Sequence, residues 1–248
     1  MTRTTPRRVD LFVGPTAHRL PEGLLHQAGV RRHPPARRGS IARLIESQPP
    51  ATIALVDGRY DDVPAVGHRE LLDALGAGWQ VTGLGSIGAL RAAELHLLGM
   101  TGYGRVFEHL LATGAPDDEV ALLHAPAPDY RPLSEALVDL RALAHHLAHA
   151  GVLEDTEATA VIDDLALRWF GDRTVPTFLD TVSAVAGSAA ASAARAQLHR
   201  LPEIRIKSGD LRDYLTERSW TLPPTPARSS PPTAEAGPSS TPATTRSV

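Results

Sequence analysis

Residues 80–94 read QVTGLGSIGALRAAE, and they pass from a short apolar run through a cluster of glycines into a run of strong helix formers. The cluster consists of Gly83, Gly85 and Gly88, with Ser86 standing among them. Glycine lets the backbone turn sharply, and a serine directly before a helix either caps free N–H groups or is exposed as a nucleophile. This pattern predicts that the functional site of the chain lies around Ser86.

The first third of the chain alternates short apolar runs with segments of helical periodicity. The pattern predicts strands over Val9–Val13, Thr52–Val56 and Val81–Leu84, and helices over Ile41–Ser47, His68–Leu75 and Leu90–Leu98. Such alternation is typical of an α/β fold, in which flanking helices cover a mostly parallel sheet. Because the carboxyl ends of parallel strands meet at one edge of the sheet, we expect Gly14, Asp57 and Ser86 to gather there.

The rest of the chain has a weaker pattern that favours helices. It predicts a glycine-rich loop over Gly99–Gly104, a helix over Val106–Leu111, a possible strand over Asp118–His124, and helices over Ser134–Ala148 (capped by Ser134), Thr156–Trp169, Pro176–Leu198 and Gly209–Glu217. From Pro223 onward the composition is Pro, Ser, Thr and Ala with few apolar side chains, which cannot form a core. We therefore predict an α/β core over 1–150, a helical extension packed on it over 151–220, and a disordered tail over 221–248.

The composition excludes several classes of function. The chain has 25 Lys plus Arg against 28 Asp plus Glu, a net charge of −3, which gives no electrostatic case for nucleic acid or an anionic membrane as the main partner. It has no cysteine, which excludes disulfides, thiolate catalysis and cysteine-ligated zinc. Lys207 is the only lysine, so chemistry that needs a titratable amine has one candidate. No signal sequence or membrane-spanning run is recognisable, which predicts a cytoplasmic location.

The glycine cluster also matches the G-x-G-x-x-G pattern of a dinucleotide-binding turn. That interpretation requires a second strand soon after the helix, ending in an acidic residue about 20 residues further on. The stretch found there, GMTGYGRVFEHL, is glycine-rich and then helical, with Glu108 inside the helix. A nucleotide-binding enzyme therefore stays open as a weaker hypothesis, and no cofactor is predicted.

A nucleophile at Ser86 fits the local pattern somewhat better. The residue lies at a strand-to-helix transition between small residues, where its hydroxyl can face solvent while the amide of Ile87 points at a developing oxyanion. The plainer alternative is that Ser86 is only a helix N-cap. The sequence is not a strict G-x-S-x-G, so it specifies no hydrolase family.

Polar residues on two predicted helices are further candidates. Arg91 and Glu94 follow Ser86 and are one turn apart, so they can orient a carboxylate or simply pair with each other. The triplet His68-Arg69-Glu70 opens the helix that follows the second predicted strand. It can supply a base and an anion clamp, or it can be a solvated first turn with Glu70 favoured by the helix dipole.

Two clusters have the residue types of metal ligands. His145, His146 and His149 lie at helical spacing, but no acidic residue is near on that face, so a solvent-facing strip is the better interpretation. The acidic run Asp117–Glu119 can hold a divalent cation, but a boundary between a loop and a strand explains it adequately. No metal site is predicted.

Six ordered blocks give the chain a family resemblance. They are VDLFVGPT, ALVDGRYDDVPAVGHRELLDAL, VTGLGSIGALRAAEL, GMTGYGRVFE, DDEVALLHA and YRPLSEALVDLR, and they span about Val9 to Arg141. In this order they closely resemble the TfuA-like family. The helical C-terminal part looks compatible with the family but has little signature.

TfuA-like proteins are partners of YcaO enzymes, which use ATP to activate a peptide amide so that sulfur replaces its oxygen. The resemblance implies that this chain supports backbone thioamidation in the biosynthesis of modified peptides. It would release sulfur from a thiocarboxylated ThiS-like carrier protein and help the YcaO engage its peptide substrate. The absence of cysteine agrees, because sulfur must then arrive on another molecule. The competing hypothesis is a non-enzymatic scaffold that recruits carrier and substrate to the YcaO.

The resemblance also implies a hydrolase-like Ser/Lys pair, with the serine at Ser86 and the lysine in the block matched by His68-Arg69-Glu70. Here the chain departs from the pattern, because Arg69 stands at the expected lysine position and an arginine is effectively always protonated. Three explanations stay open. His68 takes the role of the base, Lys207 folds back into the site, or the family's lysine matches a different position of this chain.

The candidate residues follow from these arguments. The catalytic candidates are Ser86, His68 and Arg69. The substrate-binding candidates are Arg91, Asp57, Gly14, Gly85 and Gly88, among which Arg69 and Arg91 would hold the thiocarboxylate anion.

Overall fold

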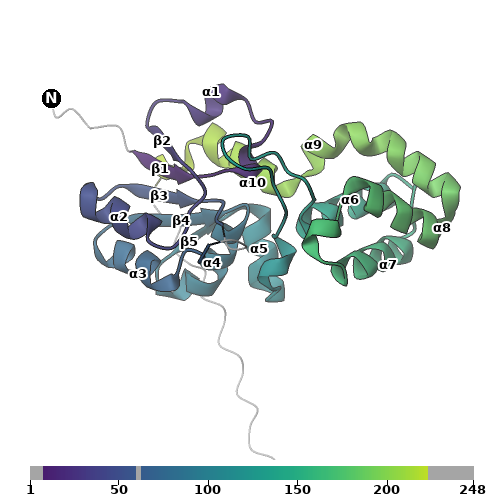
Figure 1. The fold of residues 1–248 in the computed structure, drawn as a ribbon, viewed down its shortest axis with the longest axis horizontal. Coiled ribbons are helices and arrows are strands. Elements are labelled where there is room, and N and C mark those ends of the chain that lie inside the picture. Colours follow the sequence, from purple (N-terminus) through teal and green to yellow (C-terminus); the bar gives the residue numbers. More distant parts are fainter. Residues whose placement is uncertain (1–7, 60–62, 223–248) are drawn as a thin grey trace, which may run out of the picture.

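The computed structural model describes residues 8–59 and 63–222. Within these residues a five-stranded sheet forms the centre of the fold, and all of its pairings are parallel. The strands are β1 (Val9–Phe12), β2 (Val30–His33), β3 (Thr52–Leu55), β4 (Gln80–Leu84) and β5 (Thr101–Tyr103), in the spatial order β2-β1-β3-β4-β5 (Figure 1). The predicted α/β class with a mostly parallel sheet is confirmed. The direction in which strands are added reverses between β1 and β3, where sheets of this order place their ligands.

Helices cover both faces of the sheet. The helices α1 (Glu22–Leu25) and α10 (Ile206–Glu217) pack on one face, while α2 (Ser40–Ser47), α3 (His68–Gly76) and α4 (Ile87–Leu95) cover the other (Figure 1). Alternate residues of β1 supply the two cores: Leu11 packs toward α10 and Phe12 packs toward α2. Strands buried on both faces read as continuous apolar runs, which is why β1, β3 and β4 were predictable.

Two strands were not predicted, and one predicted strand is wrong. The edge strand β2 has the sequence VRRH, in which exposed Arg31 and Arg32 hide the apolar signal. The predicted loop over Gly99–Gly104 is wrong, because its central residues form β5 at the other edge. The predicted strand over Asp118–His124 is wrong as well: a 3-10 turn, η3 (Asp117–Glu119), is followed by irregular chain with one isolated bridge.

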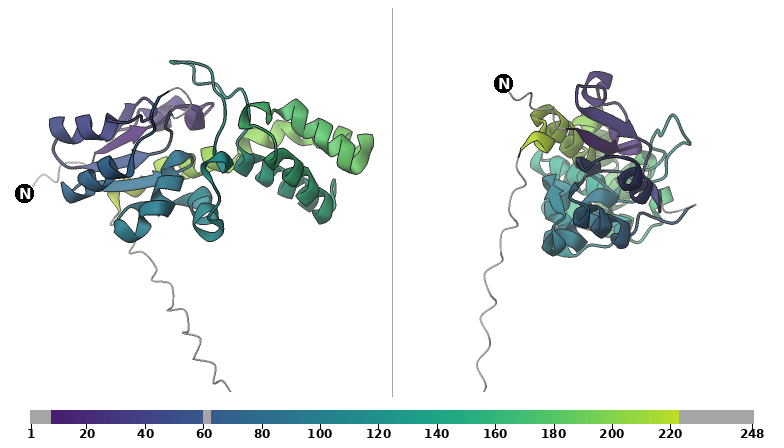
Figure 2. Two further views of the ribbon diagram at one scale, coloured as in Figure 1. Left: turned by 60° about the horizontal axis from the view of Figure 1, so that its bottom comes forward. Right: turned by 90° about the vertical axis from the view of Figure 1, so that its left-hand side faces the viewer.

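The helices that follow build a second core beside the sheet. After α5 (Gly104–Thr113), the helices α6 (Leu137–His149), α7 (Asp155–Ala166), α8 (Val175–Gln197) and α9 (Leu201–Ile204) pack around one another (Figures 1 and 2). Gly187, with φ of 89°, interrupts α8. The chain then returns to the sheet through α10. The C-terminal helical part is therefore confirmed, with its last helix contributing to the core of the sheet.

The predicted cap of α6 is wrong. The helix begins at Leu137 after Ala136, and the Ser134 hydroxyl instead accepts a hydrogen bond from the Leu123 amide at 2.8 Å. The divisions at residues 150 and 220 stay predictions, and the tail from residue 223 onward lies outside the described residues. Over 8–59 and 63–222, no helix has the length and apolar character needed to cross a membrane.

Candidate functional site

The ends of β1, β3 and β4 meet at one edge of the sheet, as predicted. The Gly14 amide donates a hydrogen bond to Asp57 Oδ2 at 2.8 Å, which joins the first two ends. Asp57 and Ser86 line the same small cavity of about 20 Å³. The other residues that line it are Pro15, Gly58, Val120, Leu122, His124 and Phe170. The cavity therefore lies at the reversal point of the strand order, and it has room for about one water molecule.

Asp57 fixes the turn after β1. Its Oδ2 accepts hydrogen bonds from the amides of Gly14 and Thr16 at 2.8 and 3.0 Å, and its Oδ1 accepts one from the Thr16 hydroxyl at 2.6 Å. The side chain is almost completely buried. Both carboxylate oxygens are therefore occupied within the fold, where they hold the 3-10 turn η1 (Pro15–Ala17) against β3.

Ser86 occupies the N-cap position of α4 without capping it. Its side chain makes no capping hydrogen bond, and its φ and ψ of −132° and −130° are unlike those of an ordinary cap. Among the described residues its hydroxyl has no hydrogen-bond partner, although the residue is 7% exposed. The Gly88 amide donates to the Val56 carbonyl, whereas the Ile87 amide has no acceptor in this part of the chain. A free hydroxyl and a free helix amide are thus adjacent in the sequence.

The glycines of the cluster have clear roles in the backbone. Gly85 has φ of +68°, which lets the chain turn from β4 toward α4. A Cβ at Gly88 would lie 1.7 Å from the Leu55 carbonyl oxygen, and one at Gly83 would lie 2.0 Å from the Gly88 oxygen. These contacts bring α4 against β3 and β4, so the glycines serve close helix-to-sheet packing.

His68 and Arg91 form a separate group around Glu94. His68 Nε2 and Arg91 Nη1 each lie 2.6 Å from Glu94 Oε2, and Arg91 Nε donates to the Val66 carbonyl. Burial by itself would raise the pKa of Glu94, but the hydrogen bonds from Arg91 and His68 outweigh it and hold that pKa below its ordinary value. Arg69 points elsewhere: its side chain is 89% exposed and pairs with Asp73. None of these three candidates lines the Ser86 cavity.

Lys207 packs next to the cavity, although it is not one of the residues that line it. Its carbonyl oxygen is 3.4 Å from the position of a Cβ at Gly85, and its Nζ donates a hydrogen bond to the carbonyl of Val120, a cavity residue. Burial lowers the pKa of the Lys207 amine, while the carboxylates of Asp57 and Asp139 oppose that shift. The only lysine of the chain therefore contacts one wall of the cavity, while the residue itself lines a neighbouring pocket together with Glu135 and Asp139. Its role as a substitute for the base stays a prediction.

His124 is a cavity residue that sequence reasoning missed. Its Nδ1 lies 2.8 Å from the Ala125 carbonyl oxygen, so Nδ1 carries the hydrogen and Nε2 carries the lone pair in the neutral ring. The ring packs edge-on against Tyr130, with centroids 5.7 Å apart. Sequence analysis placed His124 at the end of a predicted strand over Asp118–His124, so the residue was not considered as part of a site. The only sequence signal was a histidine at the end of that apolar stretch.

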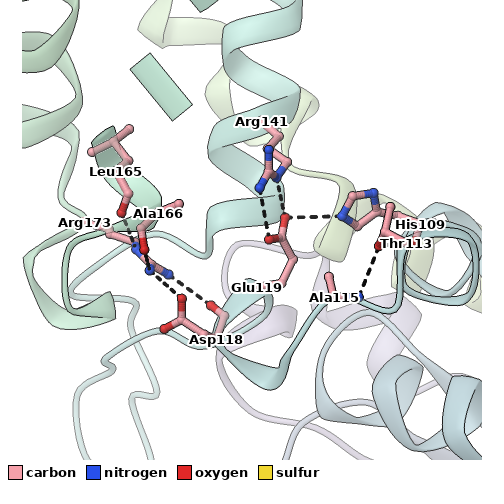
Figure 3. A network of polar contacts seen from close by, with 9 residues as sticks. All are labelled: His109, Thr113, Ala115, Asp118, Glu119, Arg141, Leu165, Ala166 and Arg173. Atoms are coloured by element: carbon pink, nitrogen blue, oxygen red, sulfur yellow. Dashed lines mark hydrogen bonds and ion pairs between the residues drawn. The ribbon is translucent and has the colours of Figure 1, made fainter. Parts of the chain in front are cut away.

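A network of arginines anchors the chain segment that leads to His124 (Figure 3). Buried Arg173 donates to backbone carbonyls at the end of α7, to the Asp118 carbonyl, and to Asp118 Oδ2 at 2.5 Å. The neighbouring Glu119 accepts from Arg141 Nε at 2.6 Å, and His109 Nε2 lies 3.3 Å from it. The wall of the cavity is therefore tied to the helical part.

The two clusters with metal-ligand residue types have other surroundings. Asp118 and Glu119 are paired with arginines, while His145 and His149 are exposed on α6. Within 8–59 and 63–222, no group of three acidic or histidine side chains is placed to hold a metal ion.

Comparison with known families supports the resemblance. A family model described as TfuA-like protein matches residues 57–174. The matched segment starts at Asp57, includes Ser86 and His124, and ends before Lys207. No curated protein matches the chain.

Proposed function

Since this chain belongs to the TfuA-like family, whose model matches residues 57–174, we propose that it is the accessory protein of a YcaO enzyme in peptide or protein thioamidation. In this proposal it releases sulfur from a thiocarboxylated, ThiS-like carrier protein and helps the YcaO engage its peptide substrate. The supporting observation is the free hydroxyl of Ser86 in a cavity at the reversal point of the sheet, beside the only lysine of the chain.

The proposed reaction is a two-step hydrolysis. Ser86 Oγ attacks the carbonyl carbon of the carrier's C-terminal thiocarboxylate and gives its proton to a base. The C–S bond then breaks, and sulfur leaves as hydrosulfide with that proton, so an ester remains between Ser86 and the carrier. Water hydrolyses the ester, which restores the serine and leaves the carrier with an ordinary carboxylate. The free Ile87 amide is the candidate donor to the oxyanion of both steps.

We assign the base role to Lys207. A buried amine with a lowered pKa accepts a proton more readily than Arg69, which is exposed, paired with Asp73 and permanently charged. Lys207 would thus complete the Ser/Lys pair from a different position in the sequence. His124 is the second candidate, because its Nε2 carries a lone pair and the residue lines the same cavity.

One observation favours the scaffold hypothesis. The cavity of about 20 Å³ holds about one water molecule, so a carrier C-terminus reaches Ser86 only if the cavity opens. A scaffold needs no such opening. In that case the protein binds the carrier and the YcaO, and sulfur transfer takes place on the YcaO.

A reconstituted thioamidation assay separates the two. The YcaO, its peptide, ATP and the thiocarboxylated carrier are combined with the full-length chain, and thioamide formation is followed by peptide mass. We expect Ser86→Ala to abolish the stimulation with an unchanged melting temperature, and exposed Arg69→Gln to retain it. Full stimulation by Ser86→Ala would reject the nucleophile and favour the scaffold. No stimulation by the wild-type chain would reject both.

A further inference from the structure

A basic groove of about 500 Å³ lies at the β2 edge of the sheet. We call it the arginine groove, and its lining includes Arg31, His33, Arg37, Arg43, Arg59 and Tyr130. These side chains come from β2, from the loop after it, from α2, from the segment after β3 and from the loop before α6. Arginines from several elements that face one hollow indicate a binding surface rather than a solvated face of a single helix.

Part of the positive charge of the arginine groove is left without an ion pair within the described residues. The buried carboxylate of Asp10 is shared by three cations, Arg8 at 2.9 Å and the groove residues His33 at 2.8 Å and Arg31 at 3.9 Å. Arg37 and Arg43 are exposed and form no ion pair within the described part of the chain. Arg37 and Arg43 therefore give the groove positive charge that no described carboxylate pairs with, although the whole chain has a net charge of −3.

The N-terminus of α2 does not supply the binding site. The Glu70 carboxylate accepts hydrogen bonds from the amides of Gly39 and Ile41 at 3.1 Å, so the first turn of α2 already has an internal anion. An anionic ligand would therefore be held by the guanidinium groups and not by free helix amides.

The groove lies beside a free strand edge. Within the described residues β2 pairs with β1 alone, so its other edge has backbone N–H and C=O groups available to another chain. Arg31 and His33 are two residues apart in β2, and both line the groove. An extended polypeptide that pairs with this edge would place every second side chain over the arginines.

We propose that the arginine groove and the free edge of β2 bind an extended acidic segment of a partner polypeptide. Carboxylate side chains of the segment would pair with Arg37 and Arg43, while the backbone of the segment hydrogen-bonds to β2. Nucleic acid also binds arginine-lined grooves, but it does not use a free strand edge in this way. This inference goes beyond the proposed function and does not depend on chemistry at Ser86.

One end of the arginine groove lies next to the Ser86 cavity. Tyr130 lines the groove, and its ring packs against His124, which lines the Ser86 cavity. At the same place a Cβ on Gly14 would lie 2.4 Å from Pro35, another groove residue, and 3.4 Å from the Tyr130 ring. A bound segment that continues past Tyr130 therefore approaches the carboxyl edge of the sheet.

The test is a binding measurement on the full-length chain with a synthetic probe. The probe is a fluorescein-labelled peptide of alternating glutamate and valine, and fluorescence anisotropy is recorded over a range of salt concentrations. Arg37→Glu/Arg43→Glu reverses two groove charges. The matched control, Arg195→Glu/Arg200→Glu, makes the same change in net charge on exposed residues of the helical part.

We expect the wild type and the control to bind the peptide equally, with affinity falling as salt rises, and the groove variant to bind roughly tenfold more weakly or worse. A probe with the same charges but N-methylated at alternate amides should also bind more weakly, because it cannot complete the pairing with β2. Equal binding by both double variants, or no binding of the peptide by the wild type, would overturn the proposal. Preferential binding of a single-stranded RNA oligonucleotide in the groove would overturn it too.

Discussion

Replacing Asp57 with alanine tests how the cavity is built. The substitution removes the acceptor of three hydrogen bonds, from the Gly14 amide, the Thr16 amide and the Thr16 hydroxyl. All three donors belong to the buried turn between β1 and η1. The variant therefore leaves two buried backbone N–H groups without a partner and frees the wall of the cavity that Pro15 forms.

The expected cost follows from these contacts. A hydrogen bond to a charged group contributes about 1.5–3 kcal/mol to stability, and the contributions of one cluster do not add fully. We therefore expect Asp57→Ala to lower the free energy of unfolding by about 3–5 kcal/mol. Thr16→Val removes only the hydroxyl bond and should cost about 1–2 kcal/mol. Asp57→Asn retains one acceptor oxygen and should fall between the two.

Urea unfolding followed by circular dichroism measures these differences, provided that the three variants and the wild type share one slope with denaturant. The order of stability should be wild type, Thr16→Val, Asp57→Asn and Asp57→Ala. A cost of less than about 1 kcal/mol for Asp57→Ala would show that the carboxylate does not fix the turn after β1.

Three further predictions concern packing, pH and the helical part. Gly88→Ala places a Cβ 1.7 Å from the Leu55 carbonyl oxygen, so α4 must move outward; we expect a loss of roughly 3 kcal/mol or more in urea unfolding, and a loss below 1 kcal/mol would contradict it. Burial raises the pKa of Asp139 to about 6, so the folded protein favours the protonated carboxyl group. The stability that this protonated carboxyl group contributes is lost as pH rises from about 4, the pKa in the unfolded chain, to about 6. Unfolding titrations should therefore show the wild type gaining stability relative to Asp139→Asn as pH falls through this window, and a difference independent of pH would oppose the assignment. Arg173→Met removes the donors to carbonyls of α7 and to Asp118, and it should lower the melting temperature by several degrees. The control Arg168→Met breaks a half-exposed ion pair with Asp164 and should change the melting temperature little.

The sheet was largely predictable because β1, β3 and β4 are buried on both faces. Their apolar runs end in turn residues, and parallel pairing then requires Gly14, Asp57 and Ser86 to meet. The edge strands β2 and β5 lack this signal, since the first is exposed and arginine-rich and the second is three residues long with a central glycine.

The cavity was predictable only in part. Local sequence indicates Ser86 at a strand-to-helix turn, but it does not show that the hydroxyl leaves α4 uncapped. Lys207 lies more than a hundred residues away in the sequence, and only the return of α10 to the sheet brings it to Gly85. His124 lies in irregular chain held by Ser134 and Arg173, so no periodicity identifies it.

The position of Arg69 shows the limit of matching a single residue to a family pattern. The residue lies at the expected lysine position, yet its side chain is 89% exposed and pairs with Asp73 outside the cavity. A base beside Ser86 can come from any element that reaches the site, and here the candidate is Lys207 at the start of α10.

Sulfide release in the absence of the YcaO shows whether the chain itself hydrolyses a thiocarboxylate at Ser86. The purified full-length chain is mixed with a thiocarboxylated ThiS-like carrier, and hydrosulfide is measured together with the intact mass of the carrier. We expect the wild type to convert thiocarboxylate to carboxylate catalytically, and Arg69→Gln to retain that activity. Ser86→Ala and Lys207→Gln should lose it, and His124→Gln shows whether the histidine shares the base role. Conversion that is unchanged in Ser86→Ala, or no conversion by a wild-type chain that binds the carrier, would contradict the proposed hydrolysis at Ser86.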